Sequence, residues 1–266
     1  MRRRAALASA LAGAAAASAT AALVLPATGT DTAPAGMTGA AARVLPAPVS
    51  PAFVPGAARR LARADLAHWS PVRHATLARN APGPDAPVVA SVAATTPEGT
   101  DNALAVLRLR RDATGARWVH VRLAVLPNGM TGWVPRSALG GYETVHTRLD
   151  VDLERLRATL WRSGRSLLRV PIGVGTAAAP TPRGRFYVRN RLTRYRSPVY
   201  GPVAFGTSAR SETITDWPAG GFVGIHGTDR PDLIPGRVSH GCIRMRNADI
   251  LALARLMPIG TPVEIR

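Results

Sequence analysis

From Trp69 onward, the chain consists of short apolar runs separated by turns rich in glycine and proline. Short runs bounded by such turns are typical of β-strands, and alternation of apolar and polar residues marks a strand with one buried face. The segment up to residue 141 contains five of these runs, at 75–79, 88–92, 105–110, 118–122 and 131–135. This spacing predicts a small β-barrel over residues 69–141.

The C-terminal part, residues 142–266, shows the same pattern with one exception. Strands are expected at 149–153, 160–161, 167–174, after the turn at 180–184, and at 261–265. The exception is the segment 250–257, whose apolar residues have helical spacing, with Asn247 as the predicted N-cap and Pro258 as the stop. The chain is therefore predicted to be mainly β, a small barrel followed by a β-rich domain with one or two short helices.

The N-terminus has the layout of an export signal. Arg2, Arg3 and Arg4 precede an uncharged, alanine-rich stretch over 5–24, and Pro26 lies at the end of the apolar run. A membrane span needs about 20 apolar residues, so an uncleaved anchor within 1–30 is the alternative and would tether the chain to a membrane. Residues 31–68 predict an Ala/Pro-rich linker, with a short amphipathic helix over 55–68 as a second interpretation. We expect the protein in the periplasm or the cell-wall space.

The formal net charge is +18, and all 34 basic residues are arginine. A strong positive charge is often found in proteins that bind nucleic acid. The arginines are scattered over strand-like and loop-like segments and form no single block, which argues against nucleic-acid recognition. An anionic polymer outside the cell would be an equally good electrostatic partner. We therefore expect no nucleic-acid partner.

Cys242 is the only cysteine in the 266 residues and lies in the run Ser-His-Gly-Cys at 239–242. A single thiol cannot form an internal disulfide, and a free thiol in an oxidising compartment requires a reason. It is either a nucleophile with a base nearby or a small buried hydrophobe. A zinc site is a third alternative, in which the cysteine and two histidines would gain Asp229 or Asp232 as a further ligand.

The residues around the cysteine favour the nucleophile. A thiol has an unperturbed pKa of about 8.5, so a histidine within hydrogen-bonding reach can hold it as the reactive thiolate. His226 and His240 are the candidates, and the loop between His226 and Cys242 is long enough to fold one against the other. The N–H groups of Gly241 and Cys242 are predicted to converge on a developing oxyanion, and Gly227 leaves the backbone after His226 unobstructed.

Two segments resemble known families. Residues 70–141, with a Trp-x-x-Val strand, a Gly-Trp-Val strand and a closing leucine, resemble bacterial SH3-like domains, which often bind cell-wall peptides; a spacer domain is the alternative. Residues 143–266 resemble the YkuD-type L,D-transpeptidases. The elements that agree in order and spacing are Val-Asp-Leu at 151–153, Thr-Pro-Arg-Gly-Arg-Phe at 181–186, Ile-His-Gly-Thr at 225–228, Ser-His-Gly-Cys-Ile-Arg-Met at 239–245 and Gly-Thr-Pro-Val-Glu-Ile at 260–265.

The second resemblance implies a ping-pong acyl transfer that uses no cofactor and no metal. Cys242 would attack the carbonyl of the third residue of a peptidoglycan stem peptide, expel D-Ala and pass the thioester to the side-chain amine of a second stem. The product would be a 3→3 cross-link, with stem peptides as donor and acceptor. His226 would be the base, oriented by the Gly227 carbonyl, and His240 would line the site.

The same resemblance implies supporting roles for further residues. Ser239 and Arg244 would shape the site or contact stem carboxylates, and the thiol would be susceptible to carbapenems. Tyr200, Trp217 and Phe222 are interpreted as core residues or as a substrate wall. Two alternatives stay open: a secreted cysteine L,D-carboxypeptidase that gives the thioester to water, and a non-catalytic wall-binding protein that acts through its SH3-like domain.

Overall fold

The computed structural model describes residues 66–193, 197–214 and 221–266, which belong to one compact unit. The predicted export signal or anchor over 1–30, the linker up to residue 65 and Trp217 lie outside the described residues. The end of the helix considered over 55–68 is wrong, because Ala67 and His68 belong to a β-strand that pairs with two others. Among the described residues, no helix is long and apolar enough to cross a membrane.

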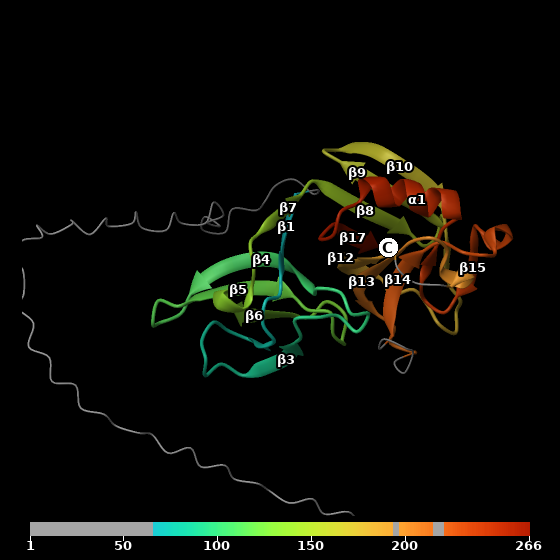
Figure 1. Ribbon diagram of the computed structural model, residues 1–266. Coiled ribbons are helices and arrows are strands. Elements are labelled where there is room, and N and C mark those ends of the chain that lie inside the picture. The colour runs from blue at the N-terminus through green and yellow to red at the C-terminus, as the bar shows by residue number, and fades with distance from the viewer. Residues whose placement is uncertain (1–65, 194–196, 215–220) are drawn as a thin grey trace, which may run out of the picture. The chain divides into compact units, whose positions relative to one another are not determined.

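The first sheet has seven strands in the order β3-β2-β6-β5-β4-β1-β7 and includes all five predicted runs (Figure 1). Its elements are β1 (Ala67–Pro71), β2 (Thr76–Arg79), β3 (Val88–Val92), β4 (Ala103–Arg111), β5 (Arg117–Arg122), β6 (Thr131–Pro135), the 3-10 helix η1 (Arg136–Ala138) and β7 (Glu143–Val145). Val119, Val121 and Val134 are fully buried in its core. The resemblance to SH3-like domains stays a prediction.

The second sheet has ten strands in the order β10-β9-β8-β17-β12-β13-β14-β16-β11-β15. Its elements are β8 (Thr147–Asp152), β9 (Arg157–Arg162), β10 (Arg165–Pro171), β11 (Gly173–Gly175), β12 (Gly184–Leu192), η2 (Pro198–Tyr200), β13 (Ala204–Arg210), β14 (Phe222–His226), η3 (Pro231–Leu233), β15 (Gly236–Ser239), β16 (Ile243–Arg244), α1 (Asn247–Leu256) and β17 (Pro262–Ile265). The sheet is mixed, because β8/β17, β14/β16 and β11/β15 are parallel pairs. The mainly β prediction is confirmed.

The apolar run predicted as one strand over 167–174 is divided in two. Strand β10 ends at Pro171 and pairs with β9, whereas β11 begins at Gly173 and pairs with β15 and β16. Between them, the fully buried Ile172 donates its N–H to the Leu156 carbonyl at 2.9 Å. An apolar run indicates that a segment is buried but not which strand it pairs with. The sequence pattern therefore does not reveal this change of partner.

Helix α1 is the only α-helix of the described residues and coincides with the predicted apolar segment. Ile250, Leu253 and Ala254 are its buried residues, and Figure 1 shows the helix beside β10. The predicted N-cap is wrong: Asn247 is the first helical residue, and the extended residue before it, Arg246, occupies the N-cap without a side-chain capping bond. The Asn247 side chain is directed to another loop instead.

Candidate active site

Strands β14 and β16 lie side by side in the second sheet and run parallel. Ile225 pairs with Ile243, and both side chains are fully buried, which anchors the register. His226 ends β14, and Cys242 immediately precedes β16. Because alternate residues of a strand share a face, this register turns the side chains at 226 and 242 to the same side of the sheet.

The Cys242 sulfur lies against the backbone of β14. The Gly224 N–H donates to Sγ at 3.4 Å, and a methyl group on Gly224 would lie 3.8 Å from both Sγ and the His226 Cδ2. Glycine therefore keeps the space between thiol and imidazole open. Part of the Cys242 residue is exposed, but protein surrounds its thiol. This burial raises the pKa of the thiol, while the Gly224 N–H and the charge of Arg244 oppose the shift.

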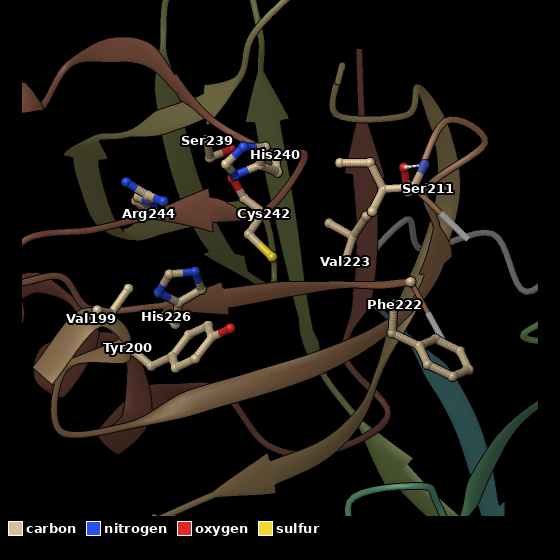
Figure 2. Close-up of a pocket in the computed structure, with 12 residues that line it drawn as sticks. Val199, Tyr200, Ser211, Phe222, Val223, His226, Ser239, His240, Cys242 and Arg244 are labelled. Carbon is tan, nitrogen blue, oxygen red and sulfur yellow. Dashed lines mark hydrogen bonds between the residues drawn. The ribbon is translucent and has the colours of Figure 1, made fainter. Parts of the chain in front are cut away.

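The His226 ring is buried and held in one orientation. Its Nδ1 lies 2.6 Å from the carbonyl oxygen of Gly227. Because a carbonyl only accepts, Nδ1 carries the proton and Nε2 of the neutral ring keeps a lone pair. Tyr200 of η2 packs edge-on against the ring, with centroids 4.8 Å apart. Figure 2 shows one ring nitrogen on the side of the Cys242 sulfur, where a base is needed.

Both groups of the pair are neutral at rest. Burial lowers the pKa of His226 to about 4, against the raising effect of the Gly227 hydrogen bond, and Arg244 lowers it further. The imidazole is therefore uncharged at neutral pH, and the buried thiol keeps its proton. Both shifts disfavour a preformed thiolate–imidazolium pair, so we expect the proton to move when the sulfur attacks.

This resting state predicts the alkylation behaviour of the single cysteine. We expect iodoacetamide to modify Cys242 slowly at neutral pH and progressively faster as the pH rises above the ordinary range of a thiol pKa, because only the thiolate reacts and burial raises the pKa of this thiol. Time-resolved intact-mass spectrometry measures the rate, and the urea-unfolded protein, whose thiol titrates at about 8.5, is the control. A folded-state rate that is already at its plateau at pH 7 would mean that the ion pair is preformed.

The turn before the cysteine is closed by the buried hydroxyl of Ser239. This hydroxyl donates to the Cys242 carbonyl at 2.6 Å and accepts the Gly241 N–H at 3.1 Å. These bonds agree with the site-shaping role considered for Ser239, and its contact with a stem carboxylate stays a prediction. The oxyanion role of the Gly241 N–H stays a prediction, and in this structure the adjacent hydroxyl binds this donor. The N–H of Cys242 stays a candidate donor.

Gly241 and Gly227 contribute to the site through the conformation and the polar groups of their backbone. Gly241 has a φ of +113°, a backbone conformation that residues other than glycine rarely adopt. The Gly227 N–H is directed to the Val203 carbonyl at 3.4 Å, so this residue acts through its carbonyl, which holds His226.

The remaining predicted residues meet in one cavity of about 230 Å³ (Figure 2). Its lining includes Tyr200, Phe222, His226, His240, Cys242 and Arg244. Arg244 is half-buried, and its Nε is buried without a hydrogen-bond partner among the described residues, whereas His240 is exposed. Tyr200 and Phe222 thus belong to the cavity wall.

No group of three or more His, Cys, Asp or Glu residues in the described part of the chain is arranged to hold a metal ion. Asp232, one of the two carboxylates considered for zinc, forms an exposed ion pair with Arg230 at 3.1 Å.

Two residues support the site in ways that the sequence did not predict, although Thr181 begins the motif at 181–186 and Asn247 was predicted as an N-cap. The buried Thr181 hydroxyl donates to the Gly241 carbonyl at 2.8 Å and accepts the Gly175 N–H at 2.9 Å, which ties the cysteine turn to β11. Asn247 is the second, because its Oδ1 accepts the Thr228 N–H at 2.9 Å. Threonine and asparagine are common in turns and at helix starts, so only the folded chain distinguishes these roles.

Replacement of Thr181 by Val is expected to destabilise the protein. The change leaves the Gly241 carbonyl and the Gly175 N–H buried and short of a partner, which costs about 1–3 kcal/mol for such a group. Urea unfolding measures the free energy, and Thr181→Ser, which keeps the hydroxyl, is the matched control. Equal stability of Thr181→Val and the wild type would show that this bridge contributes nothing.

Known proteins resemble the part of the chain that forms the second sheet. The YkuD family model, an L,D-transpeptidase catalytic domain, matches residues 146–265. Over 123 residues the chain is 36% identical to an L,D-transpeptidase YkuD of Bacillus licheniformis, and over 122 residues it is 38% identical to that of Bacillus subtilis. Each match covers 46% of this chain and 67% of the relative. The chain belongs to the YkuD family of L,D-transpeptidases.

Solved L,D-transpeptidases also match part of this family member. The Enterococcus faecium enzyme is 29% identical, with 46% of this chain and 50% of that chain covered and a TM-score of 0.36. The Mycobacterium smegmatis enzyme is 15% identical, with 62% and 90% covered and a TM-score of 0.38. The chain thus spans about half the length of the E. faecium structure.

Proposed function

We propose that this protein cross-links peptidoglycan stem peptides through a thioester on Cys242, with release of D-Ala and formation of 3→3 cross-links. The observation that carries the proposal is the parallel pairing of β14 with β16, since it sets the thiol and the neutral imidazole of His226 on one face of one cavity. Membership of the YkuD family supports peptidoglycan as the substrate.

In the first half-reaction, the Cys242 sulfur bonds to the carbonyl carbon of the third stem residue while His226 Nε2 takes the thiol proton. Both groups start neutral, so proton transfer accompanies formation of the S–C bond. The Cys242 N–H would donate to the developing oxyanion, and one such donor contributes about 10²–10³ in rate. When the tetrahedral intermediate collapses, the C–N bond to D-Ala breaks and the leaving amine takes the proton from His226.

In the second half-reaction, the side-chain amine of another stem attacks the thioester. His226 Nε2 takes a proton from the attacking nitrogen and returns it to the sulfur as the S–C bond breaks. The products are a new amide and the neutral thiol. A ring that is neutral at rest is suited to both halves, because it begins each one as a base.

Arg244 is proposed to bind a stem carboxylate. It shares a strand face with Cys242, lines the cavity and has a buried Nε without a partner among the described residues. The planar guanidinium fits a carboxylate with two parallel hydrogen bonds. The exposed His240 would assist substrate placement at the same cavity.

The reaction is proposed to take place outside the cytoplasm, in the periplasm or the cell-wall space. The arginines at 2–4 followed by the uncharged stretch over 5–24 support export.

The product of the purified protein tests the proposal. We expect incubation with a disaccharide tetrapeptide to release D-Ala and to yield a cross-linked dimer, identified by mass spectrometry. Tripeptide as the sole product would assign the protein to the L,D-carboxypeptidases, and an unchanged substrate would contradict both enzyme functions. Tandem fragmentation of the dimer distinguishes a 3→3 linkage from other linkages.

A further inference from the structure

The Asn247 carboxamide reaches from the start of α1 to the loop after His226. Its Oδ1 accepts the Thr228 N–H at 2.9 Å. The carbonyl of the preceding residue, Gly227, lies 2.6 Å from His226 Nδ1. The N–H that Asn247 binds and the C=O that His226 binds belong to one peptide unit, the one that joins Gly227 to Thr228.

A trans peptide unit is a rigid plane whose C=O and N–H point in opposite directions. A hydrogen bond that holds the N–H therefore also directs the C=O. We infer that Asn247 is a positioning residue that fixes the Gly227–Thr228 peptide plane and, through it, the tautomer and ring orientation of His226. A rotated plane would deprive the Nδ1 proton of its acceptor, and Nε2 would no longer be the obligatory site of the lone pair.

Close packing supports this role. A Cβ atom on Gly227 would lie 2.3 Å from the Asn247 Oδ1, and one on Gly201 would lie 2.4 Å from the same oxygen. The Gly201 position would also bring a Cβ to 2.7 Å from the Gly227 Cα. The carboxamide oxygen thus lies where two glycines meet, and a side chain on either one would displace it.

A role in helix initiation does not account for Asn247. The residue is the first one of α1 and not its N-cap, and asparagine favours a helix less than alanine does. Asn247→Ala should therefore leave α1 intact while it removes the acceptor for the Thr228 N–H.

Histidine tautomers are read directly by ¹⁵N NMR of the ring nitrogens. In the wild type we expect His226 to carry its proton on Nδ1 and to titrate at about pH 4. In Asn247→Ala we expect the two tautomers to exchange. In Asn247→Asp the carboxylate keeps the acceptor, so the Nδ1–H tautomer stays, and its negative charge raises the pKa of His226 against the opposing charge of Arg244. The other titratable groups at this ring are Tyr200 and Cys242.

Kinetics give a second readout. Asn247→Ala should lower kcat for D-Ala release by about 10-fold to 10²-fold, with a smaller change in KM, because the base is misoriented. Asn247→Asp should recover kcat at pH 8 and shift the acid limb of its pH profile upward. Asp249→Ala, which alters the same helical turn, is the matched control and should keep the wild-type tautomer and kcat.

The inference rests on the proposed function only in making His226 the base, and the two fail separately. A wild type that forms no product would refute the proposed function and leave the NMR result to decide on Asn247. An Asn247→Ala variant that keeps the Nδ1–H tautomer and the wild-type titration would overturn the inference.

Discussion

Replacement of Cys242 by Ala is expected to abolish D-Ala release and dimer formation. Without the only thiol in the chain, no acyl-enzyme forms, and loss of a catalytic nucleophile lowers kcat on the order of 10⁵–10⁶-fold. The measurement is D-Ala release from the disaccharide tetrapeptide, followed by mass spectrometry. Carbapenem supplies a second readout: the wild-type mass should rise by one covalent adduct, and that of the alanine variant should not.

Cys242→Ser is the matched control for this change. Serine preserves the volume and the backbone turn held by Ser239, but its hydroxyl ionises far less readily than a thiol, so activity should stay close to that of the alanine variant. Thermal unfolding of both variants should resemble that of the wild type. Cross-linking retained by Cys242→Ala would refute the thioester mechanism and direct attention to the first sheet.

Replacement of His226 by Ala is expected to lower the rate of Cys242 acylation by about 10²–10⁴-fold, the range for loss of a positioned general base. The Gly227 carbonyl holds Nδ1 on the other side of the ring and so directs the Nε2 lone pair, which the alanine variant lacks. Stopped-flow acylation by a carbapenem measures the effect. His240→Ala, which changes the exposed histidine of the same cavity, should lose much less.

The pH profile of the wild type tests the same base independently. The imidazole must be neutral to accept the thiol proton, and burial lowers its pKa to about 4. The acylation rate should therefore fall as the pH decreases through about 4, and it should show no decline around 6.5. An acid limb at the ordinary histidine pKa, or a His226→Ala rate equal to that of the wild type, would contradict this assignment.

Strand prediction succeeded where an apolar run is bounded by turn residues. The runs at 118–122 and 131–135 became β5 and β6, because each has one face in a core formed by its own neighbours. Strand β1 was missed, since a half-buried segment that ends in Pro71 is stabilised by pairing with β4 and β7 and not by its own pattern. The division of the run 167–174 at Ile172 was missed for the same reason.

The sequence indicated which residues form the site better than it indicated their hydrogen bonds. The motifs at 225–228 and 239–245 pointed to the thiol, the imidazole and the guanidinium that line the cavity. They did not show that the Ser239 hydroxyl would accept a hydrogen bond from the Gly241 N–H. The sequence alone leaves open whether this hydroxyl and this N–H bind each other or a substrate. Nor did they show that Asn247 would bind the Thr228 N–H, because helix-start residues are ordinarily interpreted as caps.

The sequence alone determined the chemistry that is available: one thiol, two nearby histidines and a β-rich chain with one helix. These follow from residue type and local periodicity, which do not depend on distant partners. Only the tertiary structure decided the charge state and the orientation of the pair. Burial disfavours the charged forms of the thiol and the imidazole, and the register of β14 with β16 sets them on one face. Both effects arise from desolvation and pairing between residues distant in the chain, so no local pattern encodes them.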